Sequence, residues 1–290
     1  MPDFPKRPRS SILFLICSVL IFCACERLQG DAANEAAQHP APQARTEPDL
    51  SASGPLAFGN PSGANINDPD NYLIVDESSV ISYNNSRGTP NWVAWKTTRD
   101  DLGPAIPRPD FQPDPRLPRT FRAITTFDYS GSGYDRGHLL PSADRFADAK
   151  LNERTFYLTN IVPQTPALNR YPWERLESYV RTQARRGMDL HQISGVYGRQ
   201  RIIREKLVAP TNCWKIIAVV PRGRRIEDMD PRMRIIAVDM PNITGIENDD
   251  WKRYSVTIHE IEQRTGLDFF NHLPSSLSDR LKRRFEMENR

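Results

Sequence analysis

Cysteine is scarce in this chain of 290 residues, which contains 4 in all. Three of them, Cys17, Cys23 and Cys25, lie within the first 25 residues, which leaves Cys213 as the only one beyond. A single thiol cannot build an intramolecular disulfide framework, and the lack of a CxxC pair excludes the usual thiolate zinc site. Stability must therefore come from a hydrophobic core, for which 38% of apolar residues is sufficient.

Long apolar runs are lacking as well. The longest, SILFLICSVLIFCAC, has about fourteen apolar residues, short of the roughly twenty that a membrane-spanning helix needs. Because it follows a short basic segment, it is typical of a secretory signal peptide, expected at residues 1–25. Its end, Phe22 to Cys25, is similar to a bacterial lipoprotein signal. Lipidation at Cys25 and ordinary cleavage stand as equal alternatives, beside an uncleaved anchor. We expect export to the periplasm, to the outer envelope as a lipid-anchored protein, or to the exterior.

Aromatic residues are missing from the stretch that follows. Residues 26–57 contain no Phe, Trp or Tyr and are rich in Ala, Pro, Gln and Ser. Such a segment cannot bury enough apolar surface to offset the entropy of ordering, so we expect a flexible tether. Globular character returns at Phe58, and we expect a single domain over 58–290 with no internal repeat.

A large net charge is also absent. The 39 basic and 36 acidic residues leave +3, too little to make the whole protein a polycation. The charge is nevertheless uneven, because residues 170–206 hold nine basic side chains against four acidic ones. A polyanion is therefore a suitable partner for this part of the chain.

Periodicity and turn residues predict an α+β fold with a mostly antiparallel central sheet flanked by helices. The predicted strands are Tyr72–Val75, Val80–Tyr83, Asn91–Thr98, Phe156–Val162, His191–Val196, Cys213–Val220 and Arg234–Val238. Helices are expected at Pro172–Arg186 and Ser255–Thr265. Six prolines between Gly103 and Pro118 indicate an irregular surface connection. We expect four tryptophans and one cysteine in the core, namely Trp92, Trp95, Trp173, Trp214 and Cys213.

Between Tyr134 and Glu177, the blocks YDRGHLLPSADR, TFYLTNIVPQTPALNR and YPWERLE bring together the groups that phosphodiester hydrolysis needs. His138 is suited to act as the general base, because an imidazole is mostly neutral yet basic near pH 7. Asn169 offers a neutral oxygen ligand to a hard cation, for which we expect Mg²⁺, with Mn²⁺ as a substitute. Glu177 follows eight residues later, just over two helical turns, and can hold metal-bound waters on the same side.

Basic and amide side chains complete the candidate site. Three arginines are expected to contact substrate phosphates, namely Arg136, Arg170 and Arg181. The forked guanidinium donors of Arg136 can also stabilise the charge of the transition state. Asn160 is expected to orient a water or a phosphate. Simpler interpretations remain open for three residues, of which Arg181 can be no more than part of a solubilising face. Asn160 can be only a turn residue, and Glu177 can be only a helix-face charge paired with Arg181.

Asp135-Arg136-Gly137-His138 and the block from Tyr157 to Glu177 resemble the DNA/RNA non-specific endonucleases, a branch of the ββα-metal (His-Me finger) nucleases. The likeness runs from about Phe58 to Phe269. It implies cleavage of DNA and RNA to 5′-phosphate products, with one His-Me finger site. In that family the residues matching His138, Asn169, Glu177 and Arg136 are general base, direct metal ligand, organiser of metal-bound water and transition-state stabiliser.

The resemblance leaves several points open. Tyr171 stands where the family commonly has glycine, which puts the path of the chain beside Asn169 in doubt. Asp135 can orient the finger by hydrogen bonding or take a direct part in catalysis. A catalytically inactive nucleic-acid-binding envelope protein of the same fold is the alternative function. The sequence does not decide between a monomer and a homodimer.

Overall fold

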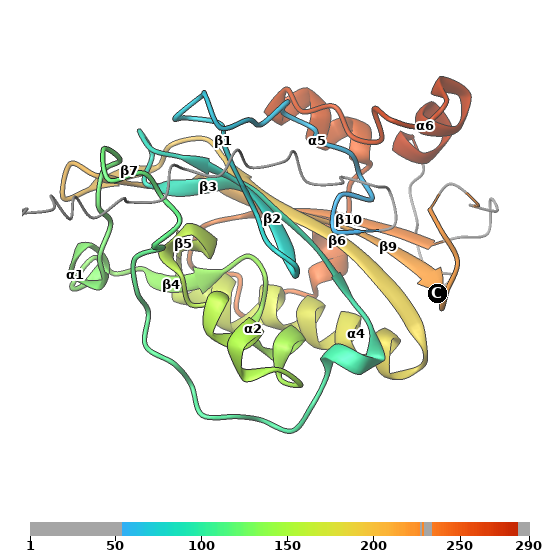
Figure 1. Ribbon diagram of the computed structural model, residues 1–290, viewed down its shortest axis with the longest axis horizontal. Helices are drawn as coiled ribbons and strands as arrows, with labels where there is room; N and C mark the ends of the chain where they lie inside the picture. Colours follow the sequence, from blue (N-terminus) through green and yellow to red (C-terminus); the bar gives the residue numbers. More distant parts are fainter. Residues whose placement is uncertain (1–53, 227, 229–233, 284–290) are drawn as a thin grey trace, which may run out of the picture. The chain divides into compact units, whose positions relative to one another are not determined.

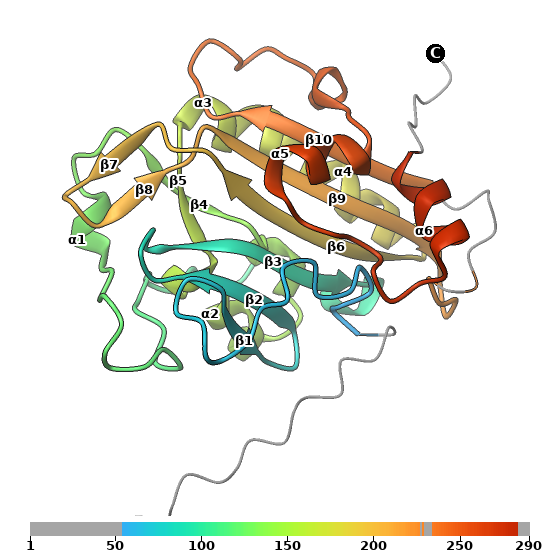
Figure 2. The ribbon, with the colours of Figure 1, turned by 90° about the horizontal axis from the view of Figure 1, so that it is seen from above.

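The computed structural model describes residues 54–226, 228 and 234–283 (Figures 1 and 2). The expected signal peptide, the lipidation site at Cys25 and residues 26–53 of the expected tether lie outside these ranges. Within them, no helix has the length and apolar character needed to cross a membrane. Leu56 and Ala57 are already buried beside Phe58, so the packed core includes the last residues assigned to the tether.

A six-stranded sheet forms the centre of the described unit, with strand order β1-β2-β3-β6-β9-β10. Its strands are β1 (Tyr72–Val75), β2 (Ser79–Asn84), β3 (Thr89–Thr97), β6 (Met188–Tyr197), β9 (Asn212–Pro221) and β10 (Arg234–Pro241). Every neighbouring pair is antiparallel. Two hairpins lie outside the sheet, β4 (Asp135–His138) with β5 (Ile161–Gln164), and β7 (Arg201–Ile203) with β8 (Leu207–Ala209). The expected α+β fold with an antiparallel central sheet is confirmed.

Helices cover both faces of the sheet (Figure 1). The described helices are α1 (Thr126–Tyr129), α2 (Ala149–Arg154), α3 (Pro166–Leu168), α4 (Glu174–Arg185), α5 (Ile258–Thr265) and α6 (Ser275–Lys282), of which α4 and α5 pack on opposite faces of the sheet. Shorter 3₁₀ turns are η1 (Arg99–Asp101), η2 (Ser142–Arg145), η3 (Leu158–Asn160) and η5 (Trp251–Tyr254), and η4 (Asn169–Trp173) is π-helical. In strand β3 the side chains alternate, so that Trp92 packs in the core under α5 and Trp95 in the core over α4.

The core residues expected from the sequence are buried as predicted. Trp92, Trp95, Trp173 and Trp214 are at most 1% exposed, and Cys213 is fully buried on β9. Burial raises the pKa of the Cys213 thiol to about 12, so this residue is a packing group at neutral pH and not a nucleophile. Residues 103–118 contain no helix and no strand, as their prolines predict.

Two predicted elements differ from those observed. The strand expected over Phe156–Val162 begins only at Ile161, because residues 158–160 turn as η3. The helix expected from Ser255 begins at Ile258, where Thr257 and Glu260 form a capping box through side-chain and backbone hydrogen bonds. In both places, local hydrogen bonds decide the boundary, and hydrophobic periodicity does not report them.

The functional motif is built as two strands and a helix. Strands β4 and β5 pair in antiparallel register, with His138 opposite Ile161, and the chain then enters α3, η4 and α4 without a break. Gly137 is required by close approach, since a Cβ at this position would lie 1.9 Å from Oε1 of Gln164. Alternation along β4 places Arg136 and His138 on one face of the hairpin.

The helix that carries Asn169 begins earlier than the sequence predicts. Pro172 lies inside the π-helical turn η4, where a regular α-helix would lose a hydrogen bond and meet the proline ring. The wider turn accommodates the proline and joins α3 to α4. Tyr171 needs no left-handed backbone here, because the only non-glycine residues with positive φ in the described ranges are Arg204, Glu205 and Phe270. Tyrosine is therefore compatible with this path.

Candidate active site

One open cleft gathers most of the residues singled out from the sequence. It lies between the β4–β5 hairpin, the loop before Phe111 and the first turns of α4. Its lining includes Arg136, His138, Asn169, Arg170, Glu177 and Arg181. These residues come from two local segments, because the hairpin and the helix that follows it fold back against one another.

His138 sits in an aromatic setting at the floor of this cleft. Its ring centroid is 5.4 Å from that of Phe111 and 4.9 Å from that of Phe156. The Nε2 atom is buried and has no hydrogen-bond partner among the described residues. Burial, and then the nearby guanidinium of Arg108, lower the pKa of His138 to about 3. The imidazole is therefore neutral at pH 7, the protonation state that a proton acceptor requires.

Asp135 fixes the orientation of Asn169. Its Oδ2 accepts a hydrogen bond from Nδ2 of Asn169 at 3.0 Å, and Arg170 donates to both carboxylate oxygens at 2.7 Å. Partial burial opposes the charge of Asp135, but the hydrogen bonds from Arg170 and Asn169 hold its pKa below the usual value. An ionised carboxylate only accepts hydrogen bonds, so the amide nitrogen of Asn169 must face it. The Oδ1 atom of Asn169 then accepts no hydrogen bond from any described residue.

Glu177 belongs to a group of four charged side chains, of which Glu177 and Arg181 line the cleft and two others lie behind it. Its Oε1 lies 3.2 Å from Nζ of Lys215 on β9, and its Oε2 lies 4.0 Å from Nη1 of Arg181. Arg181 Nη1 is in turn 3.6 Å from Oδ1 of Asp144. Burial raises the pKa of Glu177 and lowers that of Lys215, while the mutual attraction of the pair opposes both effects. We name Asp144, Glu177, Arg181 and Lys215 the buried charge quartet.

Lys215 is completely buried within this quartet. Its Nζ lies 3.4 Å from the carbonyl oxygen of Leu139, the residue after His138, and 4.5 Å from the ring centroid of Trp173. The side chain therefore reaches from the central sheet to both segments that form the cleft. A lysine is almost never buried in this way without a paired carboxylate, and here Glu177 supplies it.

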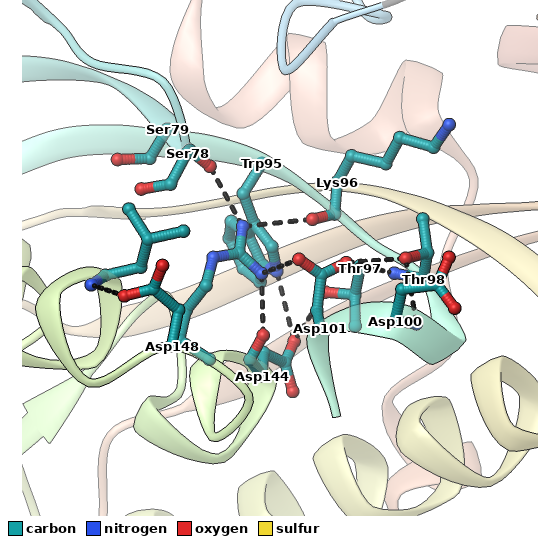
Figure 3. A network of polar contacts seen from close by, with 12 residues as sticks. Ser78, Ser79, Trp95, Lys96, Thr97, Thr98, Asp100, Asp101, Asp144 and Asp148 are labelled. Carbon is teal, nitrogen blue, oxygen red and sulfur yellow. Dashed lines mark hydrogen bonds and ion pairs between the residues drawn. The ribbon is translucent and has the colours of Figure 1, made fainter. Parts of the chain in front are cut away.

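Asp144 anchors the quartet to the central sheet. Its Oδ2 accepts hydrogen bonds from Trp95 Nε1 at 3.1 Å, Thr97 Oγ1 at 2.8 Å and Gln192 Nε2 at 3.2 Å. Figure 3 shows Asp144 beneath the strand that carries Trp95 and Thr97. The next residue, Arg145, donates to the carbonyl oxygens of Ser78 and Lys96. This second set of bonds fixes turn η2 against the sheet as well.

The expectation that Asn160 orients a water or a phosphate is wrong. The residue is 2% exposed and does not line the cleft. Its Oδ1 accepts from the Leu140 amide at 2.9 Å, and its Nδ2 donates to the carbonyl oxygens of Leu140 and Thr155. Both amide hydrogens are thus used by the backbone, which leaves none to orient a water or a phosphate. Asn160 instead holds the turn that follows His138.

Sequence reasoning missed three groups that the fold brings to this site. Arg108, from the proline-rich connection, lines the cleft and lies 5.1 Å from the Phe111 ring centroid. Lys215 and Asp144 lie behind the cleft. Of these three, only Lys215 could have been found from the sequence, because a lysine inside the apolar strand CWKIIAVV needs a buried partner. The run of basic residues from 170 to 206 does not form one surface, since Arg175 bonds carbonyl oxygens of residues 247 and 249 and Arg181 is buried.

The donor set suits a hard cation that keeps most of its waters. No group of three His, Cys, Asp or Glu side chains able to hold a metal occurs in the described part of the chain. Mg²⁺ is commonly held by one or two protein oxygens, whereas zinc requires more protein ligands. Asn169, whose Nδ2 is occupied by Asp135 so that Oδ1 is left as the oxygen donor, and the carboxylate of Glu177 both line the cleft and fit the first case.

The comparisons with known proteins decide the family. The family described as DNA/RNA non-specific endonuclease matches residues 62–276, which is most of the chain. This chain belongs to the DNA/RNA non-specific endonuclease family. The resemblance inferred from the sequence is thereby confirmed, and the chain is assigned to a family of metal-dependent nucleases that hydrolyse nucleic acids.

Two related proteins can be aligned with most of this chain. "Nuclease" from Nostoc sp. is 42% identical over 236 residues, which is 80% of this chain and 86% of that protein. "Nuclease C1" from Cunninghamella echinulata is 31% identical over 242 residues, 77% of this chain and 90% of that protein. A crystal structure of an EndoG/EndoGI complex matches with a TM-score of 0.61 at 24% identity, covering 71% of this chain and 88% of that one. This last likeness shows the shared fold.

Proposed function

We propose that the protein is a metal-dependent, sugar-non-specific endonuclease that cuts DNA and RNA to 5′-phosphate products, with His138 as general base. The observation that carries this proposal is the common cleft of His138 and Asn169. His138 lines this cleft with a neutral imidazole, and Asn169 offers an amide oxygen whose partner nitrogen is held by Asp135. Family membership supports the same reaction class.

The described residues divide the work of hydrolysis. The neutral ring of His138 takes the proton from the attacking water, and Phe111 and Phe156 keep the ring in place. Arg136 lines the same cleft and offers a fork of donors to the phosphate oxygens as their charge grows. Arg170 contacts a flanking phosphate while Asp135 holds its guanidinium. Arg181, expected from the sequence to bind phosphate, is instead buried and paired with Glu177 and Asp144.

Asn169 Oδ1 would hold Mg²⁺, or Mn²⁺ in its place, with Glu177 accepting hydrogen bonds from the waters on the ion. When bound, the ion supplies a positive charge that polarises the phosphate and stabilises the leaving oxygen. Glu177 is held for this task by Lys215 at 3.2 Å. We further propose export of the protein, on the basis of the apolar segment within residues 1–25.

A cleavage assay tests the function directly. The purified protein is incubated with supercoiled plasmid and with total RNA, with Mg²⁺ and with a chelator. We expect both substrates to be cut with Mg²⁺, cleavage to stop with the chelator, and Asn169→Ala to reduce it strongly. Intact nucleic acid in every lane of the unmodified protein, across several divalent ions, would support the inactive nucleic-acid-binding alternative instead.

Asp135→Asn provides a separate test of the metal site. The new amide no longer forces the nitrogen of Asn169 to face it, so the ligand oxygen loses its fixed direction. Loss of such a supporting partner typically costs about 10- to 100-fold in metal affinity or activity. We expect the Mg²⁺ concentration for half-maximal cleavage to rise within that range.

The matched control for Asp135→Asn is Arg170→Ala, which removes the other partner of Asp135 and keeps its bond to Asn169. This control should weaken substrate binding with little change in the Mg²⁺ requirement. An unchanged Mg²⁺ requirement in Asp135→Asn, or equal shifts in both variants, would contradict the positioning role of Asp135.

A further inference from the structure

A second basic surface lies at one end of the described unit, where the β7–β8 hairpin and α1 lie side by side in both views (Figures 1 and 2). We name it the hairpin surface. Its basic residues are Arg87, Arg122, Arg199, Arg201, Arg204 and Lys206, of which all but Arg87 are exposed. The acidic residues among them are the exposed Glu205 and the buried Asp128, which lies 3.9 Å from Nζ of Lys206, so that six basic residues stand against two acidic ones.

The arginines of the hairpin surface bond to backbone carbonyl oxygens and not to carboxylates. Arg201 donates to Ser132 O at 3.3 Å, and Arg204 donates to Ser130 O at 3.1 Å. Arg122 donates to Glu205 O at 3.1 Å, and Arg87 donates to Gly198 O at 2.6 Å. A carbonyl oxygen fixes the direction of a guanidinium without neutralising it. Within the described ranges, these four side chains therefore keep their full charge for an external anion.

The pKa of Arg87 reports the crowding of like charges on this surface. It is lowered first by burial and then by the neighbouring charge of Arg199. Arg116 shows the opposite shift. Burial alone would lower its pKa, but the hydrogen bonds and charges of Asp114 and Asp76 raise it. A protein gains no stability from gathering uncompensated arginines, so the arrangement indicates a polyanionic ligand.

An exposed aromatic ring completes the hairpin surface. Phe127 on α1 is 64% exposed, the largest exposed fraction among the large hydrophobic residues of the described ranges. The guanidinium carbon of Arg204 lies 4.1 Å from its centroid, so the two planar groups stack. Aromatic rings and arginine planes of this kind are the usual partners of unstacked nucleic-acid bases.

The turn that presents Arg204 is strained. Lys206 N donates to Ile203 O, which makes Arg204 and Glu205 the central residues of a tight turn, with φ of 48° and 59°. The loop between β7 and β8 has three residues, 204–206. A β-turn with positive φ at both central positions favours Gly, Asn and Asp, because other side chains rarely adopt the left-handed region. A strained arginine at this place is retained at the expense of stability, as residues at binding sites often are.

The hairpin surface is continuous with the catalytic cleft. A second hollow shares Arg108, Arg136, Asn169 and Arg170 with that cleft and extends it to Ser130 and Gly131. Ser130 also supplies the carbonyl oxygen that Arg204 bonds. A strand whose phosphate lies at His138 can therefore follow one uninterrupted wall to the stacked pair of Phe127 and Arg204.

We propose that the hairpin surface is an accessory site for the nucleic-acid substrate, in which the arginines bind phosphates of a single-stranded segment beyond the cut and an unpaired base stacks on Phe127 and Arg204. This inference rests on the proposed function. It makes substrate length a determinant of affinity, because a short oligonucleotide that fills the cleft does not reach the hairpin.

The test variant is the double substitution Arg204→Asn with Glu205→Gly. It removes the stacked guanidinium and also relieves the strain of the turn, so that unfolding should require more urea while binding weakens. Fluorescence anisotropy of labelled single-stranded DNA, with the cation present and cleavage stopped by His138→Ala in every protein, measures binding. The probes are oligonucleotides of about four and about sixteen nucleotides, which span the usual site sizes.

We expect the double variant to bind the long probe about 5- to 20-fold more weakly and the short probe unchanged, as fits the loss of one stacked base. The slope of log affinity against log salt should fall by about 0.7 for the long probe. Phe127→Ser should weaken the long probe in the same direction without changing the slope. Arg222→Asn is the matched control, an exposed arginine at the opposite end of β9, about 30 Å away.

Unchanged affinity for the long probe in both hairpin variants would overturn the accessory site. So would equal losses for the two probe lengths, because the effect would then belong to the cleft. These results are separate from failure of the proposed function, which would show as intact nucleic acid after incubation with the unmodified protein in the cleavage assay.

Discussion

Replacing His138 by alanine should abolish cleavage of plasmid and RNA while leaving both the fold and substrate binding in place. General-base catalysis by a positioned side chain contributes about 100- to 10 000-fold, and the described part of the cleft offers no second imidazole. Single-turnover cleavage rates, measured with saturating Mg²⁺ and protein in excess, isolate the chemical step from binding. Anisotropy with the same substrate checks that affinity is retained.

His259→Ala is the matched control for this substitution. His259 lies on α5, which packs on the face of the sheet away from α4, and its side chain is 45% exposed. The control should cut at the rate of the unmodified protein. A His138→Ala protein that still cleaves within tenfold of the unmodified rate would show that another group accepts the proton.

The sequence predicts much of this site because its parts are close along the chain. Arg136 and His138 share one strand, and Asn169 and Glu177 share one helical segment after the paired strand. Strand alternation places Arg136 and His138 on one face, and the helical spacing places Glu177 on the same side as Asn169. The resemblance to the endonuclease family indicated that the two pairs share one site.

The rest of the site depends on contacts that only the folded chain makes. Arg108 reaches the cleft from a proline-rich connection, where no periodicity indicates direction. Asp144 bonds Thr97 and Gln192, which lie on different strands of the sheet. Asn160 lies in a motif and is polar, so the sequence favours it as a site residue, yet all its side-chain hydrogen bonds are to backbone groups. Residue type and spacing do not distinguish these outcomes, because burial decides them.

The buried charge quartet shows how the sheet takes part in the site. Two carboxylates and two cations balance one another with little contact to solvent, at separations of 3.2 to 4.0 Å. Such groups stabilise a fold only while all partners are present, because an unmatched buried charge is far more costly than the pair is favourable. The arrangement thus couples the position of Glu177 to the integrity of strand β9.

Lys215→Met should therefore be among the most destabilising single substitutions in this protein. Methionine fills a similar volume beside Trp95 and Trp173 but leaves Glu177 and Asp144 with the single cation Arg181. Breaking one partner of a buried ion pair costs about 3–5 kcal/mol, to be read from urea unfolding followed by tryptophan fluorescence. Cleavage should fall too, with a higher Mg²⁺ requirement, because Glu177 loses the contact that holds it.

A double variant separates charge from packing. Lys215→Met combined with Glu177→Gln removes both members of the pair, so its destabilisation should be smaller than the sum of the two single effects. Lys150→Met, on the exposed surface of α2, is the matched control and should change stability by less than about 0.5 kcal/mol. If Lys215→Met unfolds at the same urea concentration as this control, the ammonium does not neutralise Glu177. The quartet would then contribute nothing to the position of that carboxylate.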